Sequence, residues 1–230
     1  MIAVSQTRER VELTWKELVS LIGSFRHDMI AHGLTVGDRV AAYFPNTPET
    51  VAIFFAAALL GITFSSCPPE FGAEAVVSRF GQIDASLLYF CDAHKYGTRH
   101  IDKSVDVGAI RAAMPTLRAA IHLELSDCSE LKVRTQHHAS FVATSVLTQH
   151  PLYVLYSSGT TGLPKAIVHC HGGILHEPLK VLALHHGLDA GQRFFWISTT
   201  GWMMWNYLVS GLLVGSSIVL FDGDPAFPDL

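Results

Sequence analysis

The sequence is poor in charge and lacks the features that direct a chain to nucleic acid or to a membrane. Only 16% of its 230 residues are charged, and the 16 basic and 20 acidic side chains give a net charge of −4. No basic stripe is present, so we expect no nucleic-acid partner. The longest apolar run, residues 51–64, is shorter than the roughly 20 residues of a membrane span. We therefore expect no membrane partner.

The cysteines and histidines give no sign of disulfides or of a metal centre. The start of the sequence, MIAVSQTRER, lacks the charged-then-apolar order of a secretory signal. The sequence has four cysteines, Cys67, Cys91, Cys128 and Cys170, which are far apart and form no C-x-x-C motif. We therefore expect reduced thiols and a cytoplasmic protein. The tightest ligand cluster, residues 169–171, has no further ligand at zinc spacing, so we assign no metal ligand.

What the sequence does contain is an alternation of strand and helix patterns, in a chain that is 49% hydrophobic. Thr14 and Glu17 form a capping-box pattern that begins a helix, which Gly33 ends. Residues 38–46 predict a buried strand, and Thr47 followed by Pro48 predicts the start of a helix that runs to residue 61.

The same alternation continues along the chain. Residues 63–67, 86–92 and 118–124 predict strands, residues 74–83 and 107–114 predict helices, and the polar residues 125–150 predict a loop. Repeated strand and helix units predict an α/β fold, with a mostly parallel sheet flanked by helices. Pro178 lies inside a predicted helix that follows Gly172, where a proline costs about 3 kcal/mol and predicts a kink.

A glycine- and hydroxyl-rich loop follows the predicted strand at residues 151–156, and a second strand, residues 165–170, follows the loop. Glycines let backbone N–H groups approach a ligand closely, hydroxyls add donors, and a lysine adds a cation, which together suit a phosphate chain. A plain turn has a similar composition. The candidate phosphate-binding residues are Ser157, Ser158, Gly159, Thr160, Thr161, Gly162 and Lys165.

The loop is not a Walker A motif, which has the form G-x-x-x-x-G-K-[ST]. Gly159 and Gly162 are three residues apart, and Pro164 precedes the lysine. Ala166 stands where that motif places its magnesium-binding hydroxyl. The loop also leads into a predicted strand and not into a helix.

Residues 194–225 form the second informative stretch, in which two tryptophans and two methionines closely follow Gly201. Such clusters most often pack in a core. The alternative is that they close a small binding slot with few polar contacts.

These stretches resemble the adenylate-forming superfamily, which includes acyl-CoA synthetases, luciferases and peptide-synthetase adenylation domains. YSSGTTGLPKAIVH is similar to its phosphate-binding signature, DRVAAYFPNTPETVAIFFAAALLG to its first strand–helix unit, and SSCPPEFG to a segment of short-chain CoA synthetases. Within the family, TTGWMMWN with LFDGDP is most similar to acetoacetate-activating ligases. By that resemblance Trp202, Met203 and Met204 border the acyl group, and the loop holds the β- and γ-phosphates of ATP.

The resemblance implies an ATP-dependent acyl-CoA ligase that activates a small acid, with Mg²⁺ sharing the phosphate charge and CoA as cosubstrate. Members are more than twice as long, so residues 1–230 are expected to be a partial adenylation domain without the small C-terminal domain and its catalytic lysine. No catalytic residue is assigned here, and another chain supplying the missing segments is one open possibility. The alternatives are an acetyl- or propionyl-CoA synthetase-like ligase, a non-catalytic nucleotide- or partner-binding remnant, or a chain without function.

Overall fold

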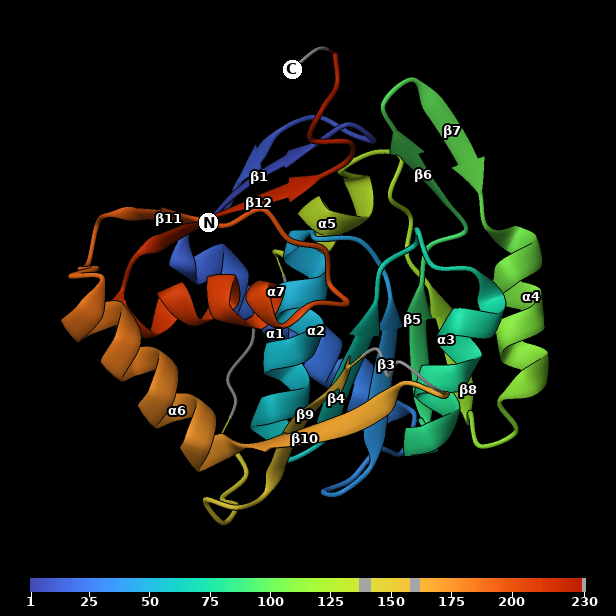
Figure 1. Cartoon of the computed structure of the whole chain (residues 1–230), viewed down its shortest axis with the longest axis horizontal. Coiled ribbons are helices and arrows are strands. Elements are labelled where there is room, and N and C mark those ends of the chain that lie inside the picture. The colour runs from blue at the N-terminus through green and yellow to red at the C-terminus, as the bar shows by residue number, and fades with distance from the viewer. Residues whose placement is uncertain (137–141, 158–161, 229–230) are drawn as a thin grey trace.

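The structure is a computed structural model, and it describes residues 1–136, 142–157 and 162–228. Its main sheet has six strands in the order β10-β9-β4-β3-β5-β8 (Figure 1). These strands are β3 (Arg39–Tyr43), β4 (Thr63–Cys67), β5 (Leu87–Phe90), β8 (Ala119–His122), β9 (Pro151–Ser157) and β10 (Lys165–Cys170). All neighbours are parallel except β9 and β10, which pair antiparallel. The predicted fold class is confirmed.

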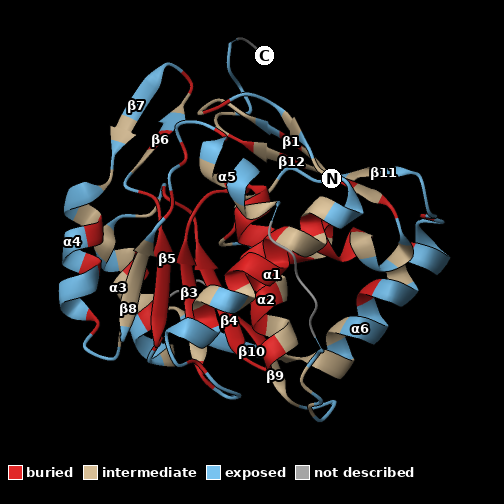
Figure 2. Ribbon diagram, turned by 180° about the vertical axis from the view of Figure 1, so that it is seen from behind, coloured by how far each residue is buried: buried red, intermediate tan, exposed pale blue. Residues whose placement is uncertain are grey.

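The alternation of side chains along the central strands creates one core on each face of this sheet. In β3, Val40 and Ala42 belong to one core, and Ala41 and Tyr43 belong to the other. The first core includes α1 (Trp15–Ala31) and α2 (Pro48–Leu60), and the second includes α3 (Ala73–Phe80) and α4 (Ser104–Ala113). Burial is heaviest in α2 and in the central strands β3, β4 and β5 (Figure 2).

A second sheet lies across the first core and joins the two ends of the described chain. It has the order β11-β12-β1-β2, formed by β11 (Arg193–Phe195), β12 (Ser217–Asp222), β1 (Ile2–Ser5) and β2 (Val11–Glu12). Strand β1 pairs parallel with β12, and Ala3, Ile218 and Leu220 enter the core of α1 and α2. These two helices and α7 (Met203–Val209) therefore lie between the two sheets (Figure 1).

The predicted helix ends are confirmed by their hydrogen bonds. At the start of α1 the Thr14 backbone N–H donates to the Glu17 carboxylate at 2.8 Å, and the Glu17 N–H donates to the Thr14 hydroxyl at 3.2 Å. Helix α2 begins at Pro48, and Gly61 ends it with a φ of 66°, a left-handed conformation that favours glycine. The capping box thus marks where α1 begins, and the proline and the glycine mark where α2 begins and ends.

The structure adds elements that the sequence patterns did not predict. The second sheet is one, and the hairpin of β6 (Ala93–Tyr96) and β7 (Arg99–Asp102) is another. Residues 125–150 were predicted to be a loop, which is wrong for α5 (Ser129–Arg134). That helix is too short to show a period, and tertiary contacts hold it, because Leu131 is buried and Arg134 binds Asp28 at 2.8 Å.

Pro178 lies inside α6 (His171–Lys180), which continues directly into the π-helical turn η2 (Val181–His185). Short 3₁₀ turns, η1 (Gly81–Ile83) and η3 (Ser210–Val214), extend α3 and α7. All four cysteines are free thiols. Within the described ranges no group of three metal-ligating side chains occurs, and no helix is long and apolar enough to cross a membrane.

Candidate functional site

The candidate phosphate loop joins β9 to β10, the two strands that the sequence predicted on either side of it, and the structure pairs them as an antiparallel hairpin. Ser157, the last residue of β9, lies directly opposite Lys165, the first residue of β10. Both side chains are exposed, as is Gly162. The other four candidates, residues 158–161, lie outside the described residues. The hairpin therefore presents a hydroxyl and an ammonium group side by side at the base of the loop.

Two hydrogen bonds, one to α3 and one from η1, fix the ends of this loop. The Tyr156 hydroxyl donates to the Arg79 carbonyl at 2.8 Å, and the Gln82 amide donates to the Pro164 carbonyl at 2.8 Å. Burial raises the pKa of Tyr156, so its hydroxyl stays protonated and remains a donor. Strands β9, β4 and β3 are parallel, so the loop projects from the carboxyl edge of the sheet. Ligands of open α/β sheets bind at this edge.

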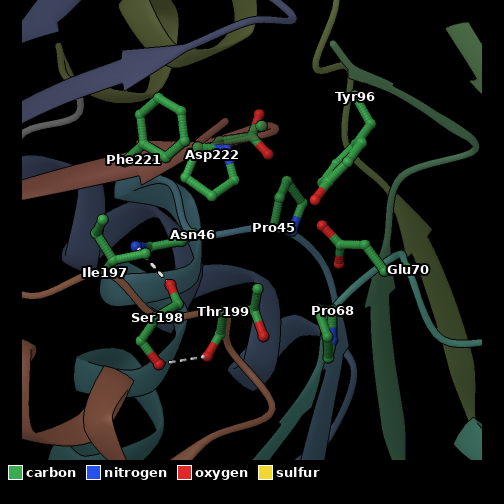
Figure 3. A pocket seen from close by; sticks show the side chains of 12 residues that line it. Pro45, Asn46, Pro68, Glu70, Tyr96, Ile197, Ser198, Thr199, Phe221 and Asp222 are labelled. Carbon is green, nitrogen blue, oxygen red and sulfur yellow. Dashed lines mark hydrogen bonds between the residues drawn. The ribbon is translucent and has the colours of Figure 1, made fainter. Parts of the chain in front are cut away.

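A cavity of about 190 Å³ lies at the same edge, between the main sheet and the β6–β7 hairpin (Figure 3). We call it the edge cavity. Its lining comes from the residues that follow β3 and β4, from β6, from the loop before α7 and from the end of β12. They are Pro45, Asn46, Pro68, Glu70, Tyr96, Ile197, Ser198, Thr199, Phe221, Asp222, Gly223 and Pro225.

Asp222 is the most strongly perturbed acid of the edge cavity. The residue is 3% exposed, and burial raises the pKa of its carboxyl group to about 6. The hydroxyls of Ser5 and Thr7 donate to it at 2.8 and 3.4 Å and oppose that shift. Glu70 also has a raised pKa through loss of hydration, and the Tyr96 hydroxyl points toward its carboxylate (Figure 3).

A second cavity, of about 410 Å³, lies between the β9–β10 hairpin, α6 and α7. We call it the α6–α7 cavity, and its volume is typical of small-molecule sites. Its walls are largely apolar, with a few polar groups. The lining residues are Tyr153, Val168, His169, Cys170, Gly173, Ile174, Glu177, Pro178, Val181, Met203, Asn206, Tyr207 and Ser210.

The three predicted acyl-contacting residues lie at different places around α7. Met203 lines the α6–α7 cavity and is 61% exposed at its rim. Trp202 caps the helix and is 60% exposed, and Met204 is half-buried; neither lines the cavity. Trp205 is fully buried, stacks on Phe64 and donates its indole N–H to Asn46 at 2.8 Å.

Asn206 and Tyr207 line the same cavity and were not among the predicted site residues. The Asn206 side-chain oxygen and the Tyr207 hydroxyl are buried and have no hydrogen-bond partner in the described part of the chain. Their spacing of three and four from Met203 places them on one helical face, which is the signal that the sequence offered.

Comparison with known families matches residues 1–230 to the AMP-binding enzymes. The chain belongs to this family. It is 42% identical over 228 residues to an acetoacetyl-coenzyme A synthetase of Rhizobium meliloti (strain 1021), which covers 94% of this chain and 35% of the relative. A malonamoyl-CoA synthetase of Penicillium aethiopicum is 32% identical over 245 residues, with 99% and 34% covered.

A solved structure, the acetoacetyl-CoA synthetase from Streptomyces lividans, matches with a TM-score of 0.92 and 46% identity. The match covers 99% of this chain and 36% of that one. The chain therefore spans about a third of the length of the relatives that it matches.

Proposed function

We propose that this chain is part of an ATP-dependent acyl-CoA ligase that activates acetoacetate to acetoacetyl-CoA. The observation that carries the proposal is the hairpin that places Ser157 opposite Lys165 in a chain of the AMP-binding family. In such a reaction a carboxylate attacks the α-phosphate of ATP and releases pyrophosphate. The thiol of CoA then attacks the acyl-adenylate and releases AMP.

The chain's contribution to the first step is to bind and orient phosphate. The exposed hydroxyl of Ser157 and ammonium of Lys165 fit the β- and γ-phosphates, and the hydrogen bonds from Tyr156 and Gln82 hold the loop ends in place. We infer the same role for residues 158–161, which lie between them. Bound Mg²⁺ supplies further positive charge to the phosphates. We assign no metal ligand to this chain.

The α6–α7 cavity is the proposed acyl site. Its apolar walls suit a short carbon chain, and Met203 at its rim is one of the three residues that the family resemblance assigns to this role. Acetoacetyl and malonamoyl groups, which the names of two relatives contain, both carry a carbonyl on the third carbon. This shared group favours a short 3-oxo acid over acetate or propionate.

We further infer that residues 1–230 form part of the adenylation domain, and that the small C-terminal domain with its catalytic lysine lies outside them. A second candidate function is nucleotide or partner binding without turnover. As part of the first proposal, the ligase, we also infer that the protein is cytoplasmic and that its partners are small molecules.

The test is a chimaera in which these residues replace the matching segment of the Streptomyces lividans relative. We expect acetoacetate-dependent pyrophosphate release, and a loss of at least about 10-fold in kcat/KM for Lys165→Ala, since one lost charge-assisted contact removes about 1.5–3 kcal/mol. Lys16→Ala, far along the chain in α1, is the matched control and should leave the rate unchanged. A folded chimaera without acetoacetate-dependent release would favour the non-catalytic function.

A further inference from the structure

One buried side chain, that of Asn46, holds two separate parts of the chain at the carboxyl edge of the main sheet. Its Nδ2 group donates to the Ser198 carbonyl at 3.3 Å (Figure 3), and its Oδ1 atom accepts the indole N–H of Trp205 at 2.8 Å. We propose that Asn46 is a positioning residue for the ligase reaction, because it fixes residues 199–204. The inference rests on the proposed function and deepens it.

Residues 199–204 connect the two cavities. Thr199 lines the edge cavity, and Met203 lines the α6–α7 cavity. Asn46 itself lines the edge cavity, and through Trp205 it is bonded to the helix that forms one wall of the other. A change in the place of this segment would therefore change both cavities and their distance from the β9–β10 hairpin.

The anchor lies on a fixed part of the backbone. Asn46 is 4% exposed and belongs to the short link between β3 and α2, where the Thr47 N–H donates to the Pro45 carbonyl at 2.9 Å. Strand β3 lies within the main sheet, and α2 lies between the two sheets. The Asn46 backbone therefore cannot shift without disturbing the core.

The two partners of Asn46 have opposite hydrogen-bonding character. An indole N–H can only donate, and a backbone carbonyl can only accept. A primary amide supplies one acceptor and one donor, so it serves both partners, and their chemistry also settles which end of the amide faces which partner. A carboxylate would lose the donor, and an aliphatic side chain would lose both groups.

Other buried hydrogen bonds hold only the first part of the segment. The Thr200 hydroxyl donates to the Phe44 carbonyl at 2.9 Å, and the Ser66 hydroxyl donates to the Thr200 carbonyl at 2.6 Å. Among the side chains of the described residues, Asn46 is the one whose hydrogen bonds reach both the loop before α7 and α7 itself. It therefore fixes the angle at which the loop enters the helix.

The segment needs such a tether because it holds large apolar side chains in water. Trp202 and Met203 are 60% and 61% exposed, and the hydrophobic effect favours folding such groups back onto the surface. The bonds of Asn46 keep the segment in one place before any substrate binds. A reaction between two bound molecules depends on this, since a small misplacement of one of them lowers the rate of the chemical step.

The first test measures amide hydrogen exchange of the 230-residue chain by mass spectrometry. Asn46→Leu keeps the approximate shape of the side chain and removes both bonds. We expect exchange in residues 199–204 to become about 10-fold faster, the factor that one or two net hydrogen bonds supply, and exchange in the β9–β10 hairpin to stay the same. If Asn46→Leu does not fold, Trp205→Phe removes one of the two bonds from the other side and should speed exchange in the same residues.

The second test introduces Asn46→Leu into the chimaera and measures pyrophosphate release per folded enzyme. We expect kcat with acetoacetate to fall at least about 10-fold, because the acid is no longer held in line with the phosphates. The KM for ATP should stay within about 2-fold, since Lys165 and the bonds that hold the phosphate loop are untouched. A purely structural role would lower the stability of the enzyme without separating these two constants.

Thr50→Val is the matched control. The Thr50 hydroxyl is buried and donates at 2.6 Å to the carbonyl of Pro45, the neighbour of Asn46, and Thr50 lines neither cavity. The substitution also removes a buried hydrogen bond at the same end of α2 and keeps the shape of the side chain. We expect unchanged exchange in residues 199–204 and an unchanged kcat.

Three results would overturn the inference. They are unchanged exchange in residues 199–204 of the Asn46→Leu chain, a kcat that does not fall in an active chimaera with this substitution, and an equal fall in kcat for Thr50→Val. A parent chimaera that releases no pyrophosphate would instead overturn the proposed function, and the exchange result alone would then decide whether Asn46 holds the segment.

Discussion

Asp222 makes the stability of this chain depend on pH in a direction opposite to that of most carboxylates. Burial raises the pKa of its carboxyl group from 3.8 to about 6. Between these two values the folded chain binds the proton and the unfolded chain has lost it. The free energy of unfolding therefore falls as the pH rises through this window. The contribution of Asp222 to stability is lowest above pH 6.

The size of the effect follows from the shift. Each unit of pKa corresponds to 1.36 kcal/mol, so a shift of about two units amounts to about 3 kcal/mol of folding free energy at neutral pH. The conversion applies here because Asp222 is only 3% exposed. Asp222→Asn removes the charge and keeps an oxygen that accepts from Ser5.

The assay is urea unfolding of the parent chain and of Asp222→Asn at pH 4 and at pH 7.5. Any constant effect of the amide cancels between the two pH values. We expect the free energy of unfolding of the variant, relative to the parent, to be about 2.4 kcal/mol higher at pH 7.5 than at pH 4, because the unfolded aspartate is already partly ionised at pH 4. A relative stability that stays the same at both pH values would refute the reasoning.

Asp127→Asn is the control of opposite sign. Hydrogen bonds from Ser129 lower the pKa of the Asp127 carboxyl group, and the side chain is exposed. The charged carboxylate stabilises the fold when the pH is above the ordinary pKa of an aspartate. That contribution is lost as the pH falls through the lowered pKa of the folded state. Relative to the parent, this variant should be less stable by nearly the same amount at pH 7.5 and at pH 4, because pH 4 still lies above the lowered pKa.

Three further substitutions test packing and capping by urea unfolding at pH 7. Arg8 and Glu49 form a buried ion pair at 2.7 Å. Glu49→Ala leaves the Arg8 charge buried and unpaired, and should lower the free energy of unfolding by about 3–5 kcal/mol. The double variant Arg8→Met with Glu49→Leu should recover most of that loss. A small loss for Glu49→Ala alone would contradict this. Thr14→Ala removes the capping box of α1 and should cost about 1 kcal/mol, whereas an unchanged midpoint would show that the cap is dispensable. Gly201→Ala places a methyl group 2.8 Å from the Pro68 ring and should lower the free energy of unfolding by about 1–3 kcal/mol. An unchanged free energy of unfolding would show that the loop before α7 shifts to accommodate the methyl group.

Local chemistry explains which parts of the fold were predictable. The cap at Thr14, the proline at residue 48 and the glycine at residue 61 act within one turn of their helices, so sequence alone located α1 and α2. Strand β1 has no such signal. Its partner is β12, with Ile2 opposite Val219, and no local pattern encodes a pairing across that separation. The second sheet was missed for this reason.

The candidate site divides in the same way. The phosphate loop is one continuous motif, and its flanking strands pair with each other, so Ser157 and Lys165 could be predicted together. The α6–α7 cavity draws on β9, β10, α6 and α7, which meet only in three dimensions. Composition pointed to the tryptophans and methionines near Gly201, but it could not show that the helical face of Met203, Asn206 and Tyr207 lines a cavity with α6.

The β9–β10 hairpin connects the two halves of the proposed chemistry. Tyr153 of β9 lines the α6–α7 cavity, and Ser157, four residues further on, begins the phosphate loop, a distance of about 13 Å along an extended strand. Strand β10 runs back over the same length, from Lys165 at the loop to Val168 and Cys170 in the cavity wall. Because both sites are built on one hydrogen-bonded pair of strands, their separation is fixed by backbone geometry.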